Sequence, residues 1–590
     1  MPSSLTRLLP FSPSTTPTQA VTYLLGISLF SISFLVFLNS SVSFVITDLI
    51  GQKHGVGDVV GTLGFVDELV ALVACPAWGL VSDRLGVRWV ATLGYTIIAV
   101  ALAVFVQAKN VYPQLLLARL LFAAGASAAA TMVTAILPSL TQDQDGGVWS
   151  TAAQPSRTKP NPRLSAAYSV ESEATITPER YSRSLSAGSP SNRRENPTLP
   201  SPLDHNKPSA LAGLVGLFTG CGALVALALF LPLPARFGEL DGVTPGQAVS
   251  YSFYSVAVVS LLVAIFVFVG LRNLRGEDAK GWRVLLGIVS GQDGSEASHM
   301  AASHKQAVIP YLCLVKESVV LGFTDSHIAL GYIGGFVARA STVAISLFIP
   351  LYVNTFFIGN GYCKGSPNDP SPELKKECRA AYVLSSILTG VAQLAGLLCA
   401  PIFGYLSGRS RCINFPVVIA TVFGLIGYII LPRLPSPEMK NEQGRGGGLS
   451  ILVVVALVGI SQIGAIVCSL GSLGQGVLHV VERRPRSAAR NGASSVPDDE
   501  VVDETDPEPE AQPLIGSAAD DSSSRVRLKG SIAGVYSLCG GVAILILTKL
   551  GGVLFDRVSQ GAPFYMMAVF NGVLLVASLL MDASKAFSHT

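Results

Sequence analysis

Charged residues are scarce in this sequence. Of its 590 residues only 13% are Asp, Glu, Lys or Arg, whereas 50% are hydrophobic, and the mean hydropathy is +0.51. A soluble protein of this length would need more charged side chains to cover its surface. The composition therefore excludes a large soluble protein and indicates a membrane protein with several spans.

Signatures of enzymes and of metal sites are also lacking. The nine cysteines are scattered, mostly within apolar segments, and show no metal-ligand spacing. The sequence contains no phosphate-binding loop and no nucleophile motif. Its glycine run, Gly213 to Gly222, lies inside an apolar segment, where close helix packing explains it. We therefore expect no enzymatic activity, no metal or other cofactor and no nucleic-acid partner.

Long apolar runs, in contrast, are abundant. A membrane-spanning helix needs about 20 mainly apolar residues, and twelve runs meet this length. They predict an all-α polytopic membrane protein with twelve transmembrane helices in two six-helix bundles. The helices are predicted at residues 20–47, 59–81, 89–106, 114–137, 211–231, 251–271, 327–354, 380–406, 415–431, 449–477, 530–555 and 563–581.

Polar segments separate these helices into groups. Two of the segments are rich in Ser, Pro and charged residues and have few large apolar ones, so we expect them to be disordered. They follow the fourth and the tenth helix, which are corresponding places in two repeated halves. The predicted order is a tail at 1–19, helices 1–4 at 20–140, an insert at 141–210, helices 5–6 at 211–271, a central linker at 272–326, helices 7–10 at 327–477, an acidic insert at 478–529, and helices 11–12 with a tail at 530–590.

Two adjacent acids, Asp67 and Glu68, lie well inside the second apolar run. A carboxylate at membrane depth costs about 2.5 kcal/mol or more, so such a residue indicates a function. Neighbouring residues point about 100° apart on a helix, so the two acids cannot both face one cavity. Arg119 in the fourth run lies at a similar depth and is expected to pair with one of them. The spare acid is then the predicted proton-carrying site, and the alternative is a static ion pair alone.

Arg339 lies about 16 Å into the seventh helix, at a rise of ~1.5 Å per residue. An arginine near the midplane should face a partner or a wet cavity. Arg339 is therefore either an anion-binding charge for a substrate or a bridge to the acids of the second helix. Uncharged polar residues predicted to complete the cavity are Gln393, Gln462 and Asn39. The alternative for these three is hydrogen bonding between helices.

The loop after the second run carries a recognisable motif, GLVSDRLGVR, with Gly79, Asp83, Arg84, Gly86 and Arg88. It resembles the signature loop between helices 2 and 3 of the major facilitator superfamily, a large group of secondary transporters. Arg119, in LLLARLLFAAGASAA, is similar to the arginine of the superfamily's fourth-helix motif. The resemblance implies the major facilitator fold, transport by alternating access, a gating role for the loop, and a cytosolic position for it.

Within the superfamily, the chain most resembles the drug and small-solute antiporters. Cys221 stands where that branch has a helix-5 proline, which leaves symport and facilitated diffusion open. We predict a monomeric, proton-coupled secondary transporter whose partners are a small-molecule substrate, protons and the lipid bilayer. The alternatives are a transporter-like sensor or receptor and an uncoupled facilitator.

Two further predictions concern the loops. Cys363 and Cys378 are the only cysteines of the loop between helices 7 and 8, and we expect a disulfide there, the alternative being two free thiols. In the acidic insert, Glu510 precedes Leu514 and Ile515 with the spacing of an acidic dileucine signal read by sorting adaptors. This predicts a vacuolar or other endomembrane location, with the plasma membrane as the alternative.

Overall fold

Twelve helices in the described part of the chain are long and apolar enough to cross a membrane. The computed structural model describes residues 10–52, 56–142, 207–240, 242–274, 277, 280–285, 311–360, 379–409, 414–438, 448–478 and 528–589. Each of the twelve overlaps one predicted helix, which confirms the predicted fold class. The spans are Pro17–Leu49, Val59–Leu85, Val87–Phe105, Val111–Thr141, Lys207–Gly238, Pro245–Gly270, Ser326–Gly359, Val383–Arg409, Phe415–Arg433, Ser450–Leu478, Lys529–Arg557 and Ala562–Ser584.

The first six spans form the N-terminal half and the last six the C-terminal half. Several spans consist of two helices joined by a short π-helical segment, such as Thr22–Leu29. The N-terminal half comprises α1 (Pro17–Val21), α2 (Phe30–Phe44), α3 (Val56–Leu85), α4 (Val87–Phe105), α5 (Leu116–Thr141), α7 (Lys207–Val225), α8 (Leu233–Gly238) and α9 (Pro245–Gly270). The C-terminal half comprises α12 (Ser326–Val343), α13 (Ile349–Gly359), α15 (Arg379–Arg409), α16 (Phe415–Ile430), α17 (Ser450–Leu478), α19 (Lys529–Ile546), α20 (Gly552–Arg557) and α21 (Ala562–His589).

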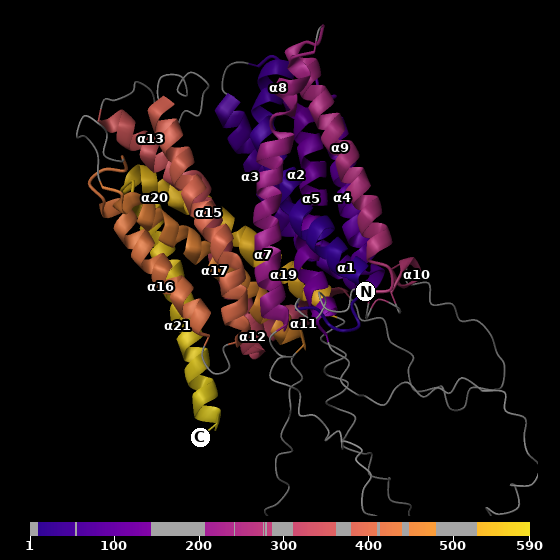
Figure 1. Ribbon diagram of the computed structural model, residues 1–590, viewed down its shortest axis with the longest axis vertical. Coiled ribbons are helices and arrows are strands. Elements are labelled where there is room, and N and C mark those ends of the chain that lie inside the picture. Colours follow the sequence, from indigo (N-terminus) through magenta and orange to yellow (C-terminus); the bar gives the residue numbers. More distant parts are fainter. Residues whose placement is uncertain are drawn as a thin grey trace, which may run out of the picture. The chain divides into compact units, whose positions relative to one another are not determined.

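The two halves meet through a small set of helices. Helices α3 and α7 of the N-terminal half pack against α19, α15 and α17 of the C-terminal half. In Figure 1 the indigo-to-magenta helices and the orange-to-yellow helices approach each other near α1 and α11 and diverge towards α8 and α13. We call the end where they approach, which carries the turn Ser82 to Arg88, the inner end, following the predicted orientation.

Glycines allow the closest approaches between the halves. A Cβ added at Gly213 of α7 would lie 2.7 Å from the Cα of Gly404 of α15. A Cβ added at Gly534 of α19 would lie 3.0 Å from the Cα of Pro76 of α3. Both contacts lie in the inner halves of their helices, so the inner ends are closed by backbone packed directly on backbone.

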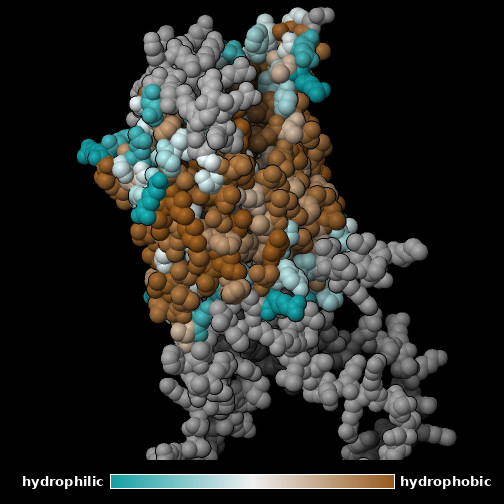
Figure 2. Space-filling view, turned by 60° about the vertical axis from the view of Figure 1, so that its left-hand side comes forward, coloured by the Kyte–Doolittle hydropathy of each residue, from teal (hydrophilic) through white to brown (hydrophobic). Residues whose placement is uncertain are grey.

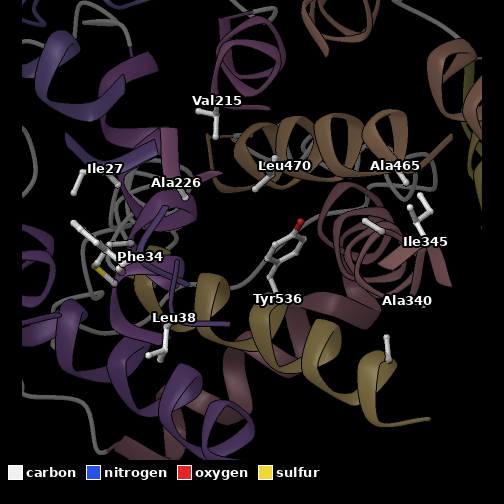
Figure 3. Packing of buried hydrophobic residues seen from close by; sticks show 14 of the residues in the cluster. Ile27, Phe34, Leu38, Val215, Ala226, Ala340, Ile345, Ala465, Leu470 and Tyr536 are labelled. Atoms are coloured by element: carbon white, nitrogen blue, oxygen red, sulfur yellow. The ribbon is translucent and has the colours of Figure 1, made fainter. Parts of the chain in front are cut away.

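The interior is filled by apolar side chains, and the outside is also apolar over a wide band. Figure 3 shows Ile27, Phe34 and Leu38 packed in the N-terminal half, and Tyr536 projecting from α19 towards Leu470 of α17. Figure 2 shows hydrophobic residues covering the flank of the helices, with hydrophilic residues near both ends. A belt of this kind is typical of a protein surrounded by lipid tails.

The predicted central linker contains two helices that the hydropathy pattern did not predict, α10 (Trp282–Leu285) and α11 (Tyr311–Thr324). Several other predictions lie outside the described residues. They are the predicted disulfide of Cys363 and Cys378, the predicted sorting signal of Glu510, Leu514 and Ile515, and nearly all of the two inserts, residues 141–210 and 478–529.

Candidate functional site

The acid of α3 that pairs with Arg119 is Asp67. The Nε of Arg119 donates hydrogen bonds to Asp67 Oδ1 and Oδ2, at 2.9 and 2.8 Å, and its Nη2 lies 2.5 Å from Oδ2. The Arg119 side chain is only 3% exposed and that of Asp67 13% exposed. Charges buried this deeply require a close counter-charge, so the pair fixes α5 against α3 within the N-terminal half.

Asn39 of α2 joins this pair. Arg119 Nη2 donates a hydrogen bond of 2.5 Å to Asn39 Oδ1. The Nη1 of Arg119 is buried and has no hydrogen-bond partner among the described residues. Three helices of the N-terminal half therefore converge on the Arg119 guanidinium, whose Nη1 has no hydrogen-bond partner among the described residues.

Glu68 is placed differently, although it is the next residue along α3. Within the described residues it forms no ion pair. Leu72, one turn further along α3, lies against α19 of the C-terminal half, where a Cβ added at Gly541 would be 3.1 Å from Leu72 Cδ2. Arg339 belongs to α12 of the other half. Its side chain lies against α19, where a Cβ added at Gly540 would be 2.6 Å from Arg339 Cγ. Glu68 and Arg339 therefore approach the same stretch of α19 from opposite halves without forming an ion pair.

Two other predicted cavity residues, Gln462 and Gln393, form no hydrogen bond with this charged group within the described residues. Gln462 of α17 donates a hydrogen bond of 2.9 Å to Thr342 Oγ1 of α12, which ties two helices of the C-terminal half together. Gln393 of α15 is exposed and lies one turn before Leu397, whose side chain contacts Gly220 of α7. Gln393 is therefore on the side of α15 that faces the N-terminal half.

The motif, which we continue to call the motif loop, lies at the inner end. Its Gly79, Asp83 and Arg84 were predicted in a loop but belong to the last two turns of α3, and Asp83 caps a helix of the opposite half. Its carboxylate accepts hydrogen bonds from Gly530 N at 2.8 Å, Ser531 N at 2.7 Å and Ser531 Oγ at 2.5 Å. The two N–H groups belong to the first turn of α19, where backbone N–H groups lack partners within the helix and attract negative charge. Gly79, one turn earlier, packs directly on the backbone of Gly530. Asp83 therefore joins the two halves.

The remaining motif residues shape the turn into α4. Gly86 has a φ of +101°, which favours glycine and lets the chain reverse between α3 and α4. Arg88 Nε donates a hydrogen bond of 2.7 Å to the Phe268 carbonyl, and its guanidinium lies 4.0 Å from the centre of the Phe268 ring. The Arg84 carbonyl accepts a hydrogen bond from Gly281 N of the central linker at 3.0 Å.

A second group of charges at the inner end was not predicted. It consists of Glu277 and Lys280 of the linker and Lys529 at the start of α19. Each lies in a polar segment, where a charged residue is ordinarily solvated, so the sequence offered no signal that they meet. No group of three or more His, Cys, Asp or Glu side chains within the described residues is positioned to hold a metal ion.

Comparisons with known proteins agree with this architecture. Residues 29–152 match the model of the Major Facilitator Superfamily. The fold is similar to that of the proton:xylose symporter XylE bound to 6-bromo-6-deoxy-D-glucose, with a TM-score of 0.50, 12% sequence identity, and coverage of 95% of this chain and 94% of that one.

Two further similar structures have lower scores. The E. coli fucose:proton symporter FucP has a TM-score of 0.49 at 11% identity, with 95% of this chain and 99% of that chain covered. The human organic anion transporter TETRAN has a TM-score of 0.47 at 13% identity, with 95% and 100% covered. No curated protein sequence matches the chain significantly. The chain has the twelve-helix fold of the major facilitator superfamily, and its residues 29–152 carry that superfamily's sequence signature.

Proposed function

We propose that the protein is a secondary transporter that moves a small solute across a membrane by alternating access, coupled to proton movement. The observation that carries this proposal is the placement of Glu68 and Arg339. An acid and an arginine from opposite halves approach the same stretch of α19 at membrane depth and form no ion pair with each other. Such residues are costly in a membrane and are retained where they serve transport.

The two acids of α3 have separate roles in this proposal. Asp67 is held by three short contacts with Arg119 and remains the fixed counter-charge of that buried arginine. Glu68 is the proton carrier, because its charge is not committed to a neighbour within its own half. Protonation of Glu68 removes its attraction to Arg339 and so weakens one link between the halves. Proton binding is thereby coupled to the relative motion of the halves.

The solute would bind beside this charged group. Arg339 either attracts an anionic group of the solute or acts only on Glu68, and the uncommitted Nη1 of Arg119 supplies a further donor. Gln393 faces the opposite half and can contribute an amide to the same region. Asn39 and Gln462 are already hydrogen-bonded to protein groups, so they support the site through Arg119 and Thr342.

The experiment measures proton movement in liposomes that contain the purified protein and the trapped pH dye pyranine. A panel of sugars, organic acids and amines is added one at a time, and a transported, coupled solute changes the internal pH. Glu68→Gln should abolish the solute-dependent pH change while the protein stays folded. The matched control is Glu317→Gln, which alters an exposed acid on α11. Asp67→Asn is less informative, because it leaves Arg119 buried without a counter-charge and can impair folding.

The outcomes separate the proposed function from its alternatives. Retention of the full pH-dependent signal by Glu68→Gln would refute Glu68 as the proton site. Uptake of a labelled solute without any pH change would indicate an uncoupled facilitator. Binding of a solute, measured as a thermal shift, without any uptake would indicate a sensor or receptor.

We also propose that the protein, as a multi-pass membrane protein, resides in a vacuolar or other endomembrane compartment. The sequence of Glu510, Leu514 and Ile515 supports this location, because it has the spacing of a signal read by cytosolic sorting adaptors.

A further inference from the structure

The first part of the central linker is fastened to the inner end of the N-terminal half. We call its described residues, 271–274, 277 and 280–285, the strap. Gln19 Nε2 donates a hydrogen bond of 2.9 Å to the Arg272 carbonyl, and Gly281 N donates one of 3.0 Å to the Arg84 carbonyl. The strap therefore follows the motif loop instead of leaving the protein surface.

Glu277 is the residue by which the strap reaches both halves. Its Oε2 accepts a hydrogen bond of 2.7 Å from Val87 N, the first residue of α4. Its Oε1 lies 2.7 Å from Lys529 Nζ, at the first residue of α19, and 3.2 Å from Lys280 Nζ. One carboxylate thus caps a helix of the N-terminal half and pairs with a lysine of the C-terminal half.

The turn before α4 is shaped to admit this carboxylate. A Cβ added at Gly86 would lie 2.5 Å from Glu277 Oε2, closer than side chains can approach. Gly86 of the motif loop therefore both allows the turn and leaves the space that Glu277 occupies.

Lys529 depends on this partner. Its side chain is fully buried, and its Nζ also lies 2.6 Å from Ser139 Oγ of α5. A lysine at a helix N-terminus is opposed by the helix dipole, and a buried ammonium group without a counter-charge is strongly destabilising. The contacts that satisfy Lys529 come from the strap and from α5, and both are lost if α19 moves away with the C-terminal half.

Glu277 is charged under physiological conditions. Burial by itself would raise the pKa of its carboxyl group, but Lys529, Lys280 and the Val87 amide outweigh this effect and hold the pKa below its usual value. The stabilisation that ionised Glu277 gives to the closed inner end is therefore fully present above the ordinary pKa of a glutamate. It is lost only as the pH falls through the lowered pKa of Glu277.

We propose that Glu277 and Lys529 form a latch by which the central linker holds the inner ends of the two halves together, and that this latch opens in each transport cycle. Glu277 is a positioning residue of the cycle, because its contacts are with Val87, Lys280 and Lys529 and not with Glu68. The inference rests on the proposed alternating access. It adds that the linker, and not only the helices, sets the balance between the two conformations.

The test measures the separation of the inner ends directly. Spin labels are attached to unnatural amino acids at Val269 of α9 and Arg409 of α15, so that the native cysteines are unchanged. Both positions are exposed, and they lie at the inner ends of different halves. Pulsed electron paramagnetic resonance of the full-length protein in lipid nanodiscs then gives the distance distribution without any solute.

Glu277→Gln and Lys529→Met should each raise the ratio of separated to closed inner ends by about tenfold or more, since each breaks a buried charge pair. The double variant should add little beyond the larger single effect, because both residues act through one contact. Glu317→Gln, in the same linker, should leave the distribution unchanged. Lys529→Met removes the buried charge, so it provides the test if Glu277→Gln fails to fold.

Unchanged distances in both single variants, or fully additive effects in the double variant, would overturn the latch. This result is distinguishable from failure of the proposed function. If the liposomes show no solute flux but the distances respond as expected, the contact that holds the inner ends together stands, whereas transport and the opening of the latch in a transport cycle do not. If Glu68-dependent flux is present but the distances do not respond, transport stands and the latch does not.

Discussion

Replacing Asp83 with alanine should shift the protein away from the conformation in which its inner ends are closed. Asp83 belongs to α3, and all three of its hydrogen-bond donors belong to Gly530 and Ser531 at the start of α19. These bonds exist only while the two halves are together at this end. Their loss therefore raises the free energy of the closed conformation and not that of the separated one.

The size of the shift follows from the contacts. A helix cap contributes about 0.5–2 kcal/mol, and a hydrogen bond to a charged group about 1.5–3 kcal/mol. Water can solvate the freed groups in part, so we expect a net loss of about 2 kcal/mol. Since 1.4 kcal/mol is a factor of ten, the ratio of separated to closed molecules should rise about 30-fold. Asp83→Asn keeps one acceptor oxygen without the charge, and its effect should be smaller.

The assay combines the Val269–Arg409 distance measurement with the liposome flux. Asp83→Ala should populate the longer distance and slow solute-dependent proton movement, while the affinity for the solute stays unchanged. Asp556→Ala, which alters an exposed acid on α20 at the outer end, serves as the matched control. Wild-type distances together with a wild-type rate in Asp83→Ala would refute the gating role of this carboxylate.

Two further predictions concern packing and location. Gly213→Val should also disfavour the closed inner end and slow transport, because a Cβ at this position would be 2.7 Å from the Cα of Gly404. The control is Gly390→Val, which should have little effect because no heavy atom lies within 4 Å of a Cβ added there. A population and a rate that are equal in the two variants would contradict this reasoning. Replacing Leu514 and Ile515 with alanine should move a fluorescently tagged protein from internal membranes to the plasma membrane, as seen by microscopy. The sorting signal would be ruled out if the native protein is already wholly at the plasma membrane or if the variant does not move.

Much of the architecture could be read from apolar length alone. A span needs enough apolar residues to cross the hydrocarbon layer, and this requirement holds whatever the neighbouring helices do. For that reason all twelve predicted helices overlap observed ones. The ends were less well predicted: α9 begins at Pro245, after a capping box formed by Thr244, and not at residue 251. Local capping, which does not depend on hydropathy, decides such boundaries.

The charged residues at membrane depth could also be recognised in the sequence, because an acid or arginine within an apolar run is conspicuous. Their partners could not all be assigned. Depth along the helices allowed Arg119 to meet either Asp67 or Glu68, and only the rotation of α3 about its axis decided for Asp67. The same rotation places Leu72, one turn after Glu68, against Gly541 of α19 in the half that carries Arg339.

The inner end shows the difference most clearly. The motif loop is contiguous, so its glycine turn and its acid were visible in the sequence, but the helix that Asp83 caps begins more than four hundred residues later. Glu277 and Lys529 lie in separate polar segments, where charges usually face water and carry no signal of burial. The sequence by itself determined which segments enter the membrane, because transfer from water to lipid is a local property of each segment. Only the tertiary structure decided which charges meet, because that depends on how helices from distant parts of the chain pack and rotate against one another.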